Sequence, residues 1–443
     1  MDIAVVGSGI SGMAAAWLLS QHHRVTVYER ENRLGGHTNT VEVSTPAGPA
    51  PVDTGFIVYN ERNYPNLTAL FRHLDVPTKP SEMSFSVSLD DGALEYAGNN
   101  LGTLFAQPRN LLRPRFWAML RDLLRFYRAA PYLLDDPGHE GLTLGAYLDR
   151  HGYSRAFIED HLLPMAAAIW SSPVHAMRDH PAASFVRFCQ NHGLLSLSGR
   201  PAWRTVNGGS REYVRRLTKS YASRVRLNSG VRSIFRKSDH VLIEDHAGRI
   251  ARHEQVVMAC HADEALALLG NPDPQETRLL GAFRYERNLA VLHADPGFMP
   301  RRRAVWSSWN YLGERYRDDE RELCVTYWMN RLQAIPEATP YFVTLNPHRS
   351  PKQGSIHASF LYDHPMFDTE AAKAQRLLWT LQGKRNIWFC GAYFGAGFHE
   401  DGLQAGLAVA EALGGVRRPW RVADESGRIH IGPVPARPLE AVS

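Results

Sequence analysis

The chain has few cysteines for its length and no cysteine or histidine spacing that binds metals. Four cysteines occur among the 443 residues, far apart in the sequence: Cys189, Cys260, Cys324 and Cys390. Without a CxxC pair, neither a disulfide framework nor a zinc site is predicted, and reduced, buried thiols are expected. Of the 20 histidines none belongs to an HExxH motif, because His399-Glu400 lacks a second histidine one helical turn later.

Strong charge imbalance and a long apolar segment are also lacking. The net charge is +5 and charged residues make up 21% of the chain, which is mild for this length. No nucleic-acid-binding motif is present, so we expect no nucleic-acid partner. Residues 3–20 carry no charge, but no basic residue precedes them and glycines and serines interrupt them, so we predict neither a signal peptide nor a membrane span. A cytoplasmic globular protein is the better interpretation.

What the sequence does contain is a glycine-rich turn between a strand and a helix at its start. An apolar strand, Ile3–Val6, is followed by Gly7-Ser8-Gly9-Ile10-Ser11-Gly12 and then by an alanine-rich helix. Gly7 permits the tight turn, Gly9 lets backbone amides approach a pyrophosphate, and Gly12 lets the helix pack closely on the strand. We predict that this turn, with Ser11, binds the pyrophosphate of a dinucleotide at the helix N-terminus.

Further predicted cofactor contacts follow the next strand, Arg24–Tyr28. This strand ends in an acid about 20 residues after the turn, the position that accepts hydrogen bonds from ribose hydroxyls. A second glycine pair can lie against the diphosphate or ribityl portion, and a short strand then leads into an Asp53-Thr54-Gly55 element. The predicted contacts of this region are Glu29, Arg30, Gly35, Gly36, His37, Thr38, Gly55 and Phe56.

The rest of the chain alternates between helical and strand-rich segments. Residues 83–97 predict a hairpin, 201–207 a connector, and 283–362 the sheet of a second domain. Near the end, a buried strand at 386–391 precedes a helix that we expect over Leu403–Leu413.

Residues 101–134 predict an amphipathic helix with a basic face. Leu112, Phe116, Met119, Leu120, Leu123 and Tyr127 recur at helical spacing, and arginines at 121, 125 and 128 fall opposite them. Such a helix can lie on an anionic membrane surface. Alternatively it packs on the core with a solvated charged face, which is the interpretation we favour.

Taken together, these motifs resemble the flavin-containing amine oxidase, protoporphyrinogen oxidase and carotenoid desaturase superfamily. The resemblance covers nearly the whole chain and also includes Asn207-Gly208-Gly209, Val231, the strand 256–259 and the segment from Cys390-Gly391 to Gly402. It implies a noncovalent FAD, with Val231 touching adenine and the N-terminus of the last helix facing the flavin, where it stabilises negative charge on the reduced ring. The contacts implied there are Gly391, Asp401, Gly402 and Leu403.

The resemblance also implies the fold. We expect an α/β and α+β protein in which a Rossmann-like, GR2-type FAD-binding domain is interleaved with a mixed-sheet and helical substrate domain. The FAD-binding domain would comprise 1–75, 200–270 and 383–420, the substrate domain 76–199 and 271–382, and an irregular tail 421–443. The chain departs from the family pattern at Glu31, His37 and Ala392, so pyrophosphate and ribityl contacts must be made differently.

More narrowly, the chain is similar to one bacterial oxidoreductase family. The strings that carry this similarity are 292–295, 299–303, Trp306–Tyr311 and Gly397–Leu403. Members are often encoded near cyclopropane-fatty-acid-synthase-like methyltransferases, and some are implicated in desaturating methylated acyl chains on the way to furan fatty acids. The resemblance thus implies lipid metabolism, a functional partnership with a fatty-acyl methyltransferase, and peripheral contact with the inner membrane surface as an open alternative.

The leading hypothesis is an FAD-dependent desaturase or dehydrogenase of a fatty-acyl or similarly apolar substrate, with hydride transfer to flavin N5. His399 and Glu400 are candidates for a base, since they lie just before the last helix; each can instead be structural, as a hydrogen-bonding residue or a first-turn acid. Tyr311 and Asn310 are further candidates for the catalytic site. The alternatives are an amine oxidase, a flavin-dependent double-bond isomerase and a noncatalytic carrier of FAD and lipid.

Overall fold

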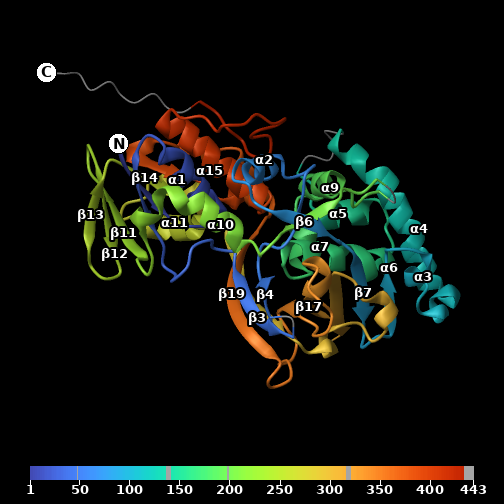
Figure 1. The fold of residues 1–443 in the computed structure, drawn as a ribbon. Helices are drawn as coiled ribbons and strands as arrows, with labels where there is room; N and C mark the ends of the chain where they lie inside the picture. Colours follow the sequence, from blue (N-terminus) through green and yellow to red (C-terminus); the bar gives the residue numbers. More distant parts are fainter. Residues whose placement is uncertain (47, 136–140, 197–198, 316–320, 434–443) are drawn as a thin grey trace.

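Two lobes make up the molecule in the computed structural model, which describes residues 1–46, 48–135, 141–196, 199–315 and 321–433. One lobe holds the N-terminus, a parallel sheet and a small antiparallel sheet; the other holds a larger sheet under a group of helices (Figure 1). This arrangement confirms the predicted mixed α/β and α+β fold.

The first lobe is built on a five-stranded parallel sheet. Its strands, in spatial order, are β10 (Val225–Arg226), β2 (Arg24–Tyr28), β1 (Asp2–Val6), β14 (Gln255–Met258) and β20 (Ile387–Phe389). Strands from both ends of the chain therefore become neighbours in one sheet. β14 and β20 are buried along their whole length, as expected of a parallel sheet covered on both faces.

Two helices, α1 (Ile10–Leu19) and α15 (His399–Gly414), pack against each other in this lobe. Glycines allow their close approach, because a Cβ added at Gly406 would lie 2.2 Å from the carbonyl oxygen of Ser11. A Cβ added at Gly402, one turn earlier, would lie 2.9 Å from the hydroxyl oxygen of Ser11. The last helix begins at His399, four residues before the predicted start, so Gly402 and Leu403 lie in its first turns.

The second lobe is built on a seven-stranded mixed sheet. Its strands, in spatial order, are β19 (Ile356–Met366), β15 (Arg284–His293), β18 (Phe342–Leu345), β17 (Arg321–Trp328), β16 (Trp309–Arg315), β7 (Phe85–Leu89) and β8 (Leu94–Ala97). The β7–β8 pair is the predicted hairpin, with left-handed backbone at Asp90, Asp91 and Gly92 in its turn. The β16–β7 pair is parallel, and the other neighbours are antiparallel.

Helices cover this sheet at the far end of the molecule. They are α3 (Leu101–Leu104), η1 (Pro108–Leu112), α4 (Pro114–Ala129), η2 (Ala130–Leu134), α5 (Leu144–Arg150), α6 (Arg155–Phe157), η4 (Ile158–Leu162), α7 (Leu163–Trp170), α8 (Ala176–Asp179) and α9 (Ala182–Asn191). Within the described ranges, none of the helices combines the length and the apolar character needed to cross a bilayer.

Three small sheets complete the fold. They are β3 (Thr40–Thr45) with β4 (Gly48–Asp53); β5 (Tyr59–Asn60), β9 (Trp203–Val206) and β6 (Thr78–Ser81); and β11 (Val231–Arg236), β12 (Val241–Asp245) and β13 (Ile250–His253). The segment 201–207, predicted as a connector, contains β9 because two strands distant in sequence supply its hydrogen-bonding partners. All strands of the five-stranded sheet come from the ranges predicted for the FAD-binding domain. All strands of the seven-stranded sheet come from the ranges predicted for the substrate domain. The division into domains itself stays a prediction.

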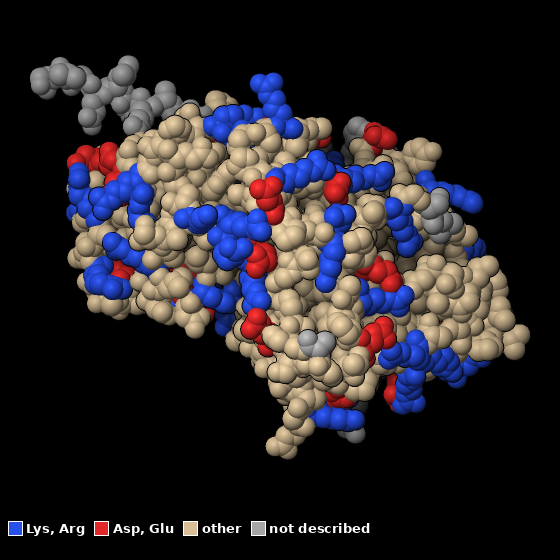
Figure 2. Space-filling model, in the orientation of Figure 1, with Lys and Arg blue, Asp and Glu red and all other residues tan. Residues whose placement is uncertain are grey.

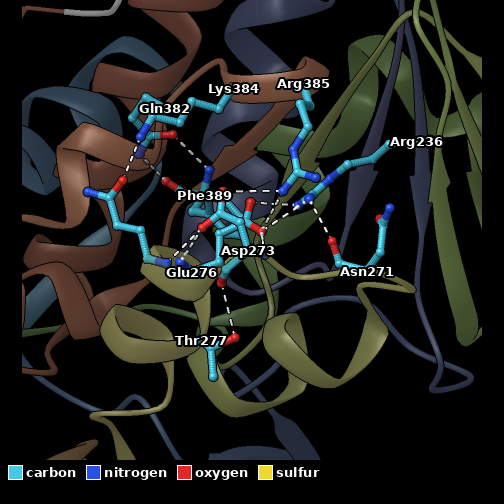
Figure 3. Close-up of polar contacts among 10 residues, drawn as sticks. Arg236, Asn271, Asp273, Glu276, Thr277, Gln382, Lys384, Arg385 and Phe389 are labelled. Carbon is cyan, nitrogen blue, oxygen red and sulfur yellow. Dashed lines mark hydrogen bonds and ion pairs between the residues drawn. The ribbon is translucent and has the colours of Figure 1, made fainter.

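A buried ionic cluster ties the small sheet of the first lobe to its helices (Figure 3). Glu276 of α12 (Pro274–Leu280) accepts hydrogen bonds at 3.1 and 2.6 Å from the guanidinium of Arg236 on β11. Arg385, just before β20, adds a third at 3.1 Å. The side chains of Arg236 and Glu276 are only 3% and 1% exposed. Because water does not reach them, each charge is stabilised mainly by the other.

Buried histidines make the fold sensitive to acid. Burial lowers the pKa of His161 and His180 to about 4 and that of His192 to about 3, from an ordinary value of 6.5. At a pH between the pKa of the folded protein and the ordinary value of 6.5, the unfolded chain binds protons that the folded protein does not. The contribution of each neutral histidine to the free energy of unfolding is therefore complete above pH 6.5 and is lost as the pH falls.

We expect the free energy of unfolding, measured with urea, to fall by about 1–2 kcal/mol per buried histidine between pH 7 and pH 5. In His180→Gln the fall in the free energy of unfolding between pH 7 and pH 5 should be smaller by the contribution of one histidine. His22→Gln, at an exposed site, should leave this fall unchanged. An unaltered dependence in His180→Gln would contradict the assignment.

Candidate functional site

A large cavity is lined by residues of both lobes. Its volume is about 1130 Å³, larger than the usual range for a small-ligand pocket. Gly7, Glu29 and Val231 line it from the first lobe, and Phe85 and Trp309 line it from the seven-stranded sheet. The residues at its two ends differ in chemistry.

At one end the cavity meets the N-terminus of α1. Gly9 is the N-cap and makes no side-chain cap, so the amides of the first turn are left for a ligand. A Cβ added at Gly9 would have no heavy atom within 4 Å, and therefore would project into open space. Gly36 has a left-handed φ of 56°. A Cβ added at Gly36 would lie 3.2 Å from the Cα of Gly9, so the two glycine loops are in close contact here.

An anchored carboxylate lies beside this loop. Glu29, at the end of β2, accepts hydrogen bonds from the backbone amide of Ser8 at 3.0 Å and from its hydroxyl at 2.5 Å. The amide of Glu31 donates a third at 2.9 Å. Glu29 lines the cavity together with Val231, while Arg30, also at the wall, pairs with Glu264. This is the arrangement expected for a carboxylate that holds ribose hydroxyls.

His37 lines the cavity with a neutral ring. Its ring stacks on Tyr362 at 5.0 Å and lies 5.2 Å from the ring of His364. Its Nε2 is buried and has no hydrogen-bond partner among the described residues. Burial lowers the pKa of His37 well below its usual value, so the ring is neutral at physiological pH. The neutral ring of His37 therefore forms part of the cavity wall beside the two glycine loops.

The other end of the cavity is apolar and rich in aromatic rings. Phe188 of α9 stacks on Phe398 at 4.7 Å and on His192 at 3.8 Å, and Trp170 lies 4.7 Å from Phe188. We call this end the aromatic half; its lining residues are Met83, Phe85, Met165, Ile169, Trp170, Phe188, His192, Leu194, Arg200, Trp203, Trp309, Tyr327, Leu345, Phe360 and Phe398.

Arg200 is the charged residue of the aromatic half. The other Asp, Glu, Lys and Arg side chains that line the cavity within the described ranges belong to its dinucleotide end: Glu29, Arg30, Glu31, Arg33, Glu264 and Asp363. Arg200 is exposed, its Nε donates to the carbonyl of Ser196 at 3.1 Å, and no ion pair within the described residues includes it. The aromatic half therefore offers a cation to a substrate and no carboxylate.

Between the two ends lies His399, one of the predicted base candidates. Its ring stacks on Phe56 with 3.7 Å between centroids, and its Nε2 lies 3.0 Å from the Thr38 hydroxyl and 3.1 Å from that of Tyr213. Burial lowers the pKa of His399 to about 3, so it is a neutral ring held at the cavity wall. Thr38 thus acts on the site through His399 rather than by lining the cavity.

Three of the predicted catalytic candidates lie outside the cavity lining of the described residues. Glu400 points to the start of α2 (Pro65–His73), where it accepts from the amides of Asn66 and Leu67, both at 3.0 Å. Asn310 is fully buried within its sheet, bonded to Ser86 at 2.8 Å and to neighbouring backbone groups. Tyr311 is fully buried in the core on that sheet.

Several predicted cofactor contacts lie outside the cavity lining, in packed positions. Gly12 keeps α1 against β1, since a Cβ there would lie 2.1 Å from the carbonyl oxygen of Gly7. Asp401 binds the amide of Phe398 at 2.8 Å and pairs with Arg428, and Gly402 and Leu403 are buried against α1. The remaining predicted contacts line the cavity: Gly7, Gly9, Ser11, Glu29, Arg30, Gly35, Gly36, His37, Gly55, Phe56, Val231 and Gly391.

The part of the aromatic half that comes from the helical segment was not predicted, whereas Trp309 and Tyr327 belong to the aromatic strands predicted for the second domain. Trp170, Phe188 and Arg200 come from the helical segment between the two strand-rich parts, where no motif marks them. Tyr362 and His364, on β19, were also missed. An apolar residue at helical spacing looks the same whether it faces a core or a cavity, so the local sequence carries no signal that would have found them.

Comparison with known proteins places the chain in a family. The model of the family "Flavin containing amine oxidoreductase" matches residues 10–296. A carotenoid phi-ring synthase from Streptomyces griseus is 35% identical over 173 residues, which is 35% of this chain and 32% of that protein; the match thus spans about a third of this relative.

Solved structures share the fold over nearly their whole length. Cyclohexylamine oxidase from Brevibacterium oxydans IH-35A aligns with a TM-score of 0.64 at 15% identity, covering 94% of this chain and 98% of that one. A fatty acid isomerase from P. acnes, described as producing CLA, has a TM-score of 0.64 at 16% identity, covering 91% of this chain and 96% of that one.

The cavity fits the cofactor of this family, FAD. The open N-terminus of α1, with free space before Gly9, would hold its pyrophosphate, and the carboxylate of Glu29 its ribose. The fit agrees with the family match, which extends over most of the chain. The chain therefore belongs to the flavin-containing amine oxidoreductase family of FAD-dependent oxidoreductases.

Proposed function

We propose that this protein is a dehydrogenase or desaturase of a fatty-acyl chain, and that in its natural substrate the chain is methylated and borne on a phospholipid. The observation that carries the proposal is the aromatic half, an apolar space continuous with the dinucleotide site. A partnership with a fatty-acyl methyltransferase, which would supply the methylated chain, is part of the same proposal.

Charge supports an acyl substrate over an amine. An alkylammonium ion would find no carboxylate in the aromatic half as the described residues define it, and it would be repelled by Arg200. A carboxylate or phosphate attached to an apolar chain would instead pair with the Arg200 guanidinium while the chain lies among the rings.

The residues of the chain then have definite roles. When bound, FAD supplies the two-electron acceptor for hydride from a substrate C–H bond. The aromatic walls, with Phe188 and Trp170, exclude water and orient the acyl chain. Desaturation also releases a proton from the neighbouring carbon to solvent. His399 is a poor acceptor for this proton, because burial lowers the pKa of its ring to about 3, and it serves instead as a neutral, hydrogen-bonded residue of the wall. Thr38 and Tyr213 fix the His399 ring.

Anaerobic mixing of the FAD-loaded protein with candidate substrates tests the proposal. Methylated unsaturated phospholipid or the free fatty acid should bleach the flavin absorbance and yield a product two hydrogens lighter. Bleaching by amines alone would establish an amine oxidase, and a product of unchanged mass formed without oxidant would establish an isomerase. Absence of turnover by the purified protein would indicate a carrier.

Arg200→Gln sharpens this test. With the free acid as substrate, we expect KM to rise about 10- to 100-fold, the effect of losing a hydrogen bond to a charged group, with a smaller change in kcat. Arg187→Gln is the matched control, because Arg187 is an exposed arginine of α9 that does not line the cavity. Equal KM values for both variants would refute the role of Arg200.

A further inference from the structure

Exposed apolar side chains are concentrated on one surface of the second lobe. Of the fifteen large hydrophobic residues that are exposed within the described ranges, six belong to the stretch 101–132. We call these residues the α4 surface: Leu101, Leu111, Leu112, Trp117, Leu124 and Tyr132. Leu112 is 86% exposed and Tyr132 is 73% exposed, so the predicted placement of Leu112 on the buried face of the helix is wrong. Such a concentration marks an interaction site.

The geometry of α4 places apolar and basic residues on the same outward face. Trp117, Arg121, Leu124 and Arg128 follow one another at spacings of four, three and four residues, which is one stripe of a helix. All four are exposed, while Phe116, Met119 and Phe126 on the opposite face are buried. A groove beside this stripe is lined by Arg121, Leu124, Arg125, Arg128, Ala129 and Tyr132.

The charge of this region has one dominant sign. Residues 101–135 contain six arginines and two aspartates, which gives a net charge of +4. One of these aspartates, Asp122, is fully buried and pairs with Arg121 and Arg125 at 3.4 and 3.6 Å, so Arg128 and the excess of arginines supply the remaining positive charge. Figure 2 shows an uncharged area over α3 and α4 that is bordered by Lys and Arg side chains. The surface thus combines exposed apolar side chains with a positive rim.

We propose that the α4 surface docks on the face of a bilayer that contains anionic phospholipids. Trp117, Leu112 and Leu124 would enter the boundary between headgroups and acyl chains, and the arginine guanidinium groups would bind lipid phosphates. A protein partner would have to supply acidic side chains around an apolar centre. A bilayer supplies both chemistries at once over an extended surface, and this is the occupant that the charge and the exposed rings favour.

The docking surface lies close to the aromatic half. α9, which carries Phe188 of the cavity wall, packs against η2 at the end of the α4 surface. Burial raises the pKa of Tyr127 on α4, and the nearby charge of Arg200 opposes this rise, so Arg200 lies within electrostatic reach of α4. Docking would therefore bring lipid next to the cavity. This link to a lipid substrate rests on the proposed function, whereas docking itself does not.

Cosedimentation of the FAD-loaded full chain with lipid vesicles tests the proposal. We expect binding to vesicles of phosphatidylcholine with phosphatidylglycerol, weaker binding to phosphatidylcholine alone, and loss of binding at high salt. The double variant Arg121→Gln with Arg128→Gln should reduce the partition coefficient about 30-fold, and Leu112→Ser with Leu124→Ser about 10-fold or more.

The matched controls are Arg252→Gln and Ile250→Ser, an exposed arginine and an exposed hydrophobic residue on β13 of the other lobe; both should bind as the wild type does. Flavin content and bleaching by detergent-dispersed substrate should stay unchanged in all variants. Wild-type binding in the α4 variants, equal binding to both vesicle types, or no binding to either would overturn the docking proposal. Loss of bleaching with intact vesicle binding would instead count against the proposed function.

Discussion

Gly9→Ala is expected to weaken FAD binding by about 100-fold or more while the apoprotein keeps its stability. Gly9 has a φ of −63° and an extended ψ, a conformation that alanine adopts without strain. The added methyl group would touch no protein atom within 4 Å and would stand in the space before the α1 N-terminus, where a pyrophosphate must approach.

Gly12→Ala is the contrasting variant, because its methyl group would lie 2.1 Å from the carbonyl oxygen of Gly7. This overlap forces α1 away from β1, so Gly12→Ala should destabilise the apoprotein itself. FAD affinity is measured by titration calorimetry and apoprotein stability by thermal denaturation. FAD affinity near the wild-type value in Gly9→Ala would mean that the cofactor does not approach this glycine.

Glu276→Ala is expected to lower the free energy of unfolding by about 3–5 kcal/mol. The substitution leaves the Arg236 guanidinium charged, 3% exposed and without its carboxylate, and it also removes the hydrogen bond from Arg385 (Figure 3). Because β11, α12 and the segment before β20 meet at this carboxylate, the loss should appear in the global unfolding transition.

The matched control is Glu370→Ala, at an exposed carboxylate that pairs with Lys373. We expect it to change the free energy of unfolding by less than about 1 kcal/mol, as is usual for surface ion pairs. Urea denaturation at pH 7 measures both variants. Similar, small effects would show that the buried cluster contributes no more than a surface pair.

Local patterns predicted the parts of the fold whose residues carry their own conformational signal. The Gly7–Gly12 motif spans the turn after β1 and the start of α1, and the alternating apolar residues after Met83 form the β7–β8 hairpin. The start of α15 was misplaced because glycine and charged residues near Gly402 suggested a loop, whereas close packing on α1 keeps them helical. In the same way, β9 exists only because β5 and β6 flank it.

In the candidate site, too, residues in short motifs were predicted and residues brought together by tertiary packing were not. The dinucleotide end was predicted because Gly9, Glu29 and Gly36 lie in short motifs whose spacing reflects the shape of the ligand. The helical part of the aromatic half was not, since Phe188, Trp170 and Arg200 meet only when the helical segment folds over the seven-stranded sheet. Glu400 shows the converse: it is close in sequence to His399, but the turn of α15 directs it away from the cavity to α2.

By itself, the sequence predicted a dinucleotide site at the turn between β1 and α1, because the glycine spacing and the apolar strand that mark such a turn act over a few residues. Only the tertiary structure decided which aromatic rings face the cavity, that Arg200 is the charge beside them, and that Trp117 and Leu124 face outward with the arginines of α4. The physical reason is that burial depends on what packs against a side chain, and the partners here are distant in sequence.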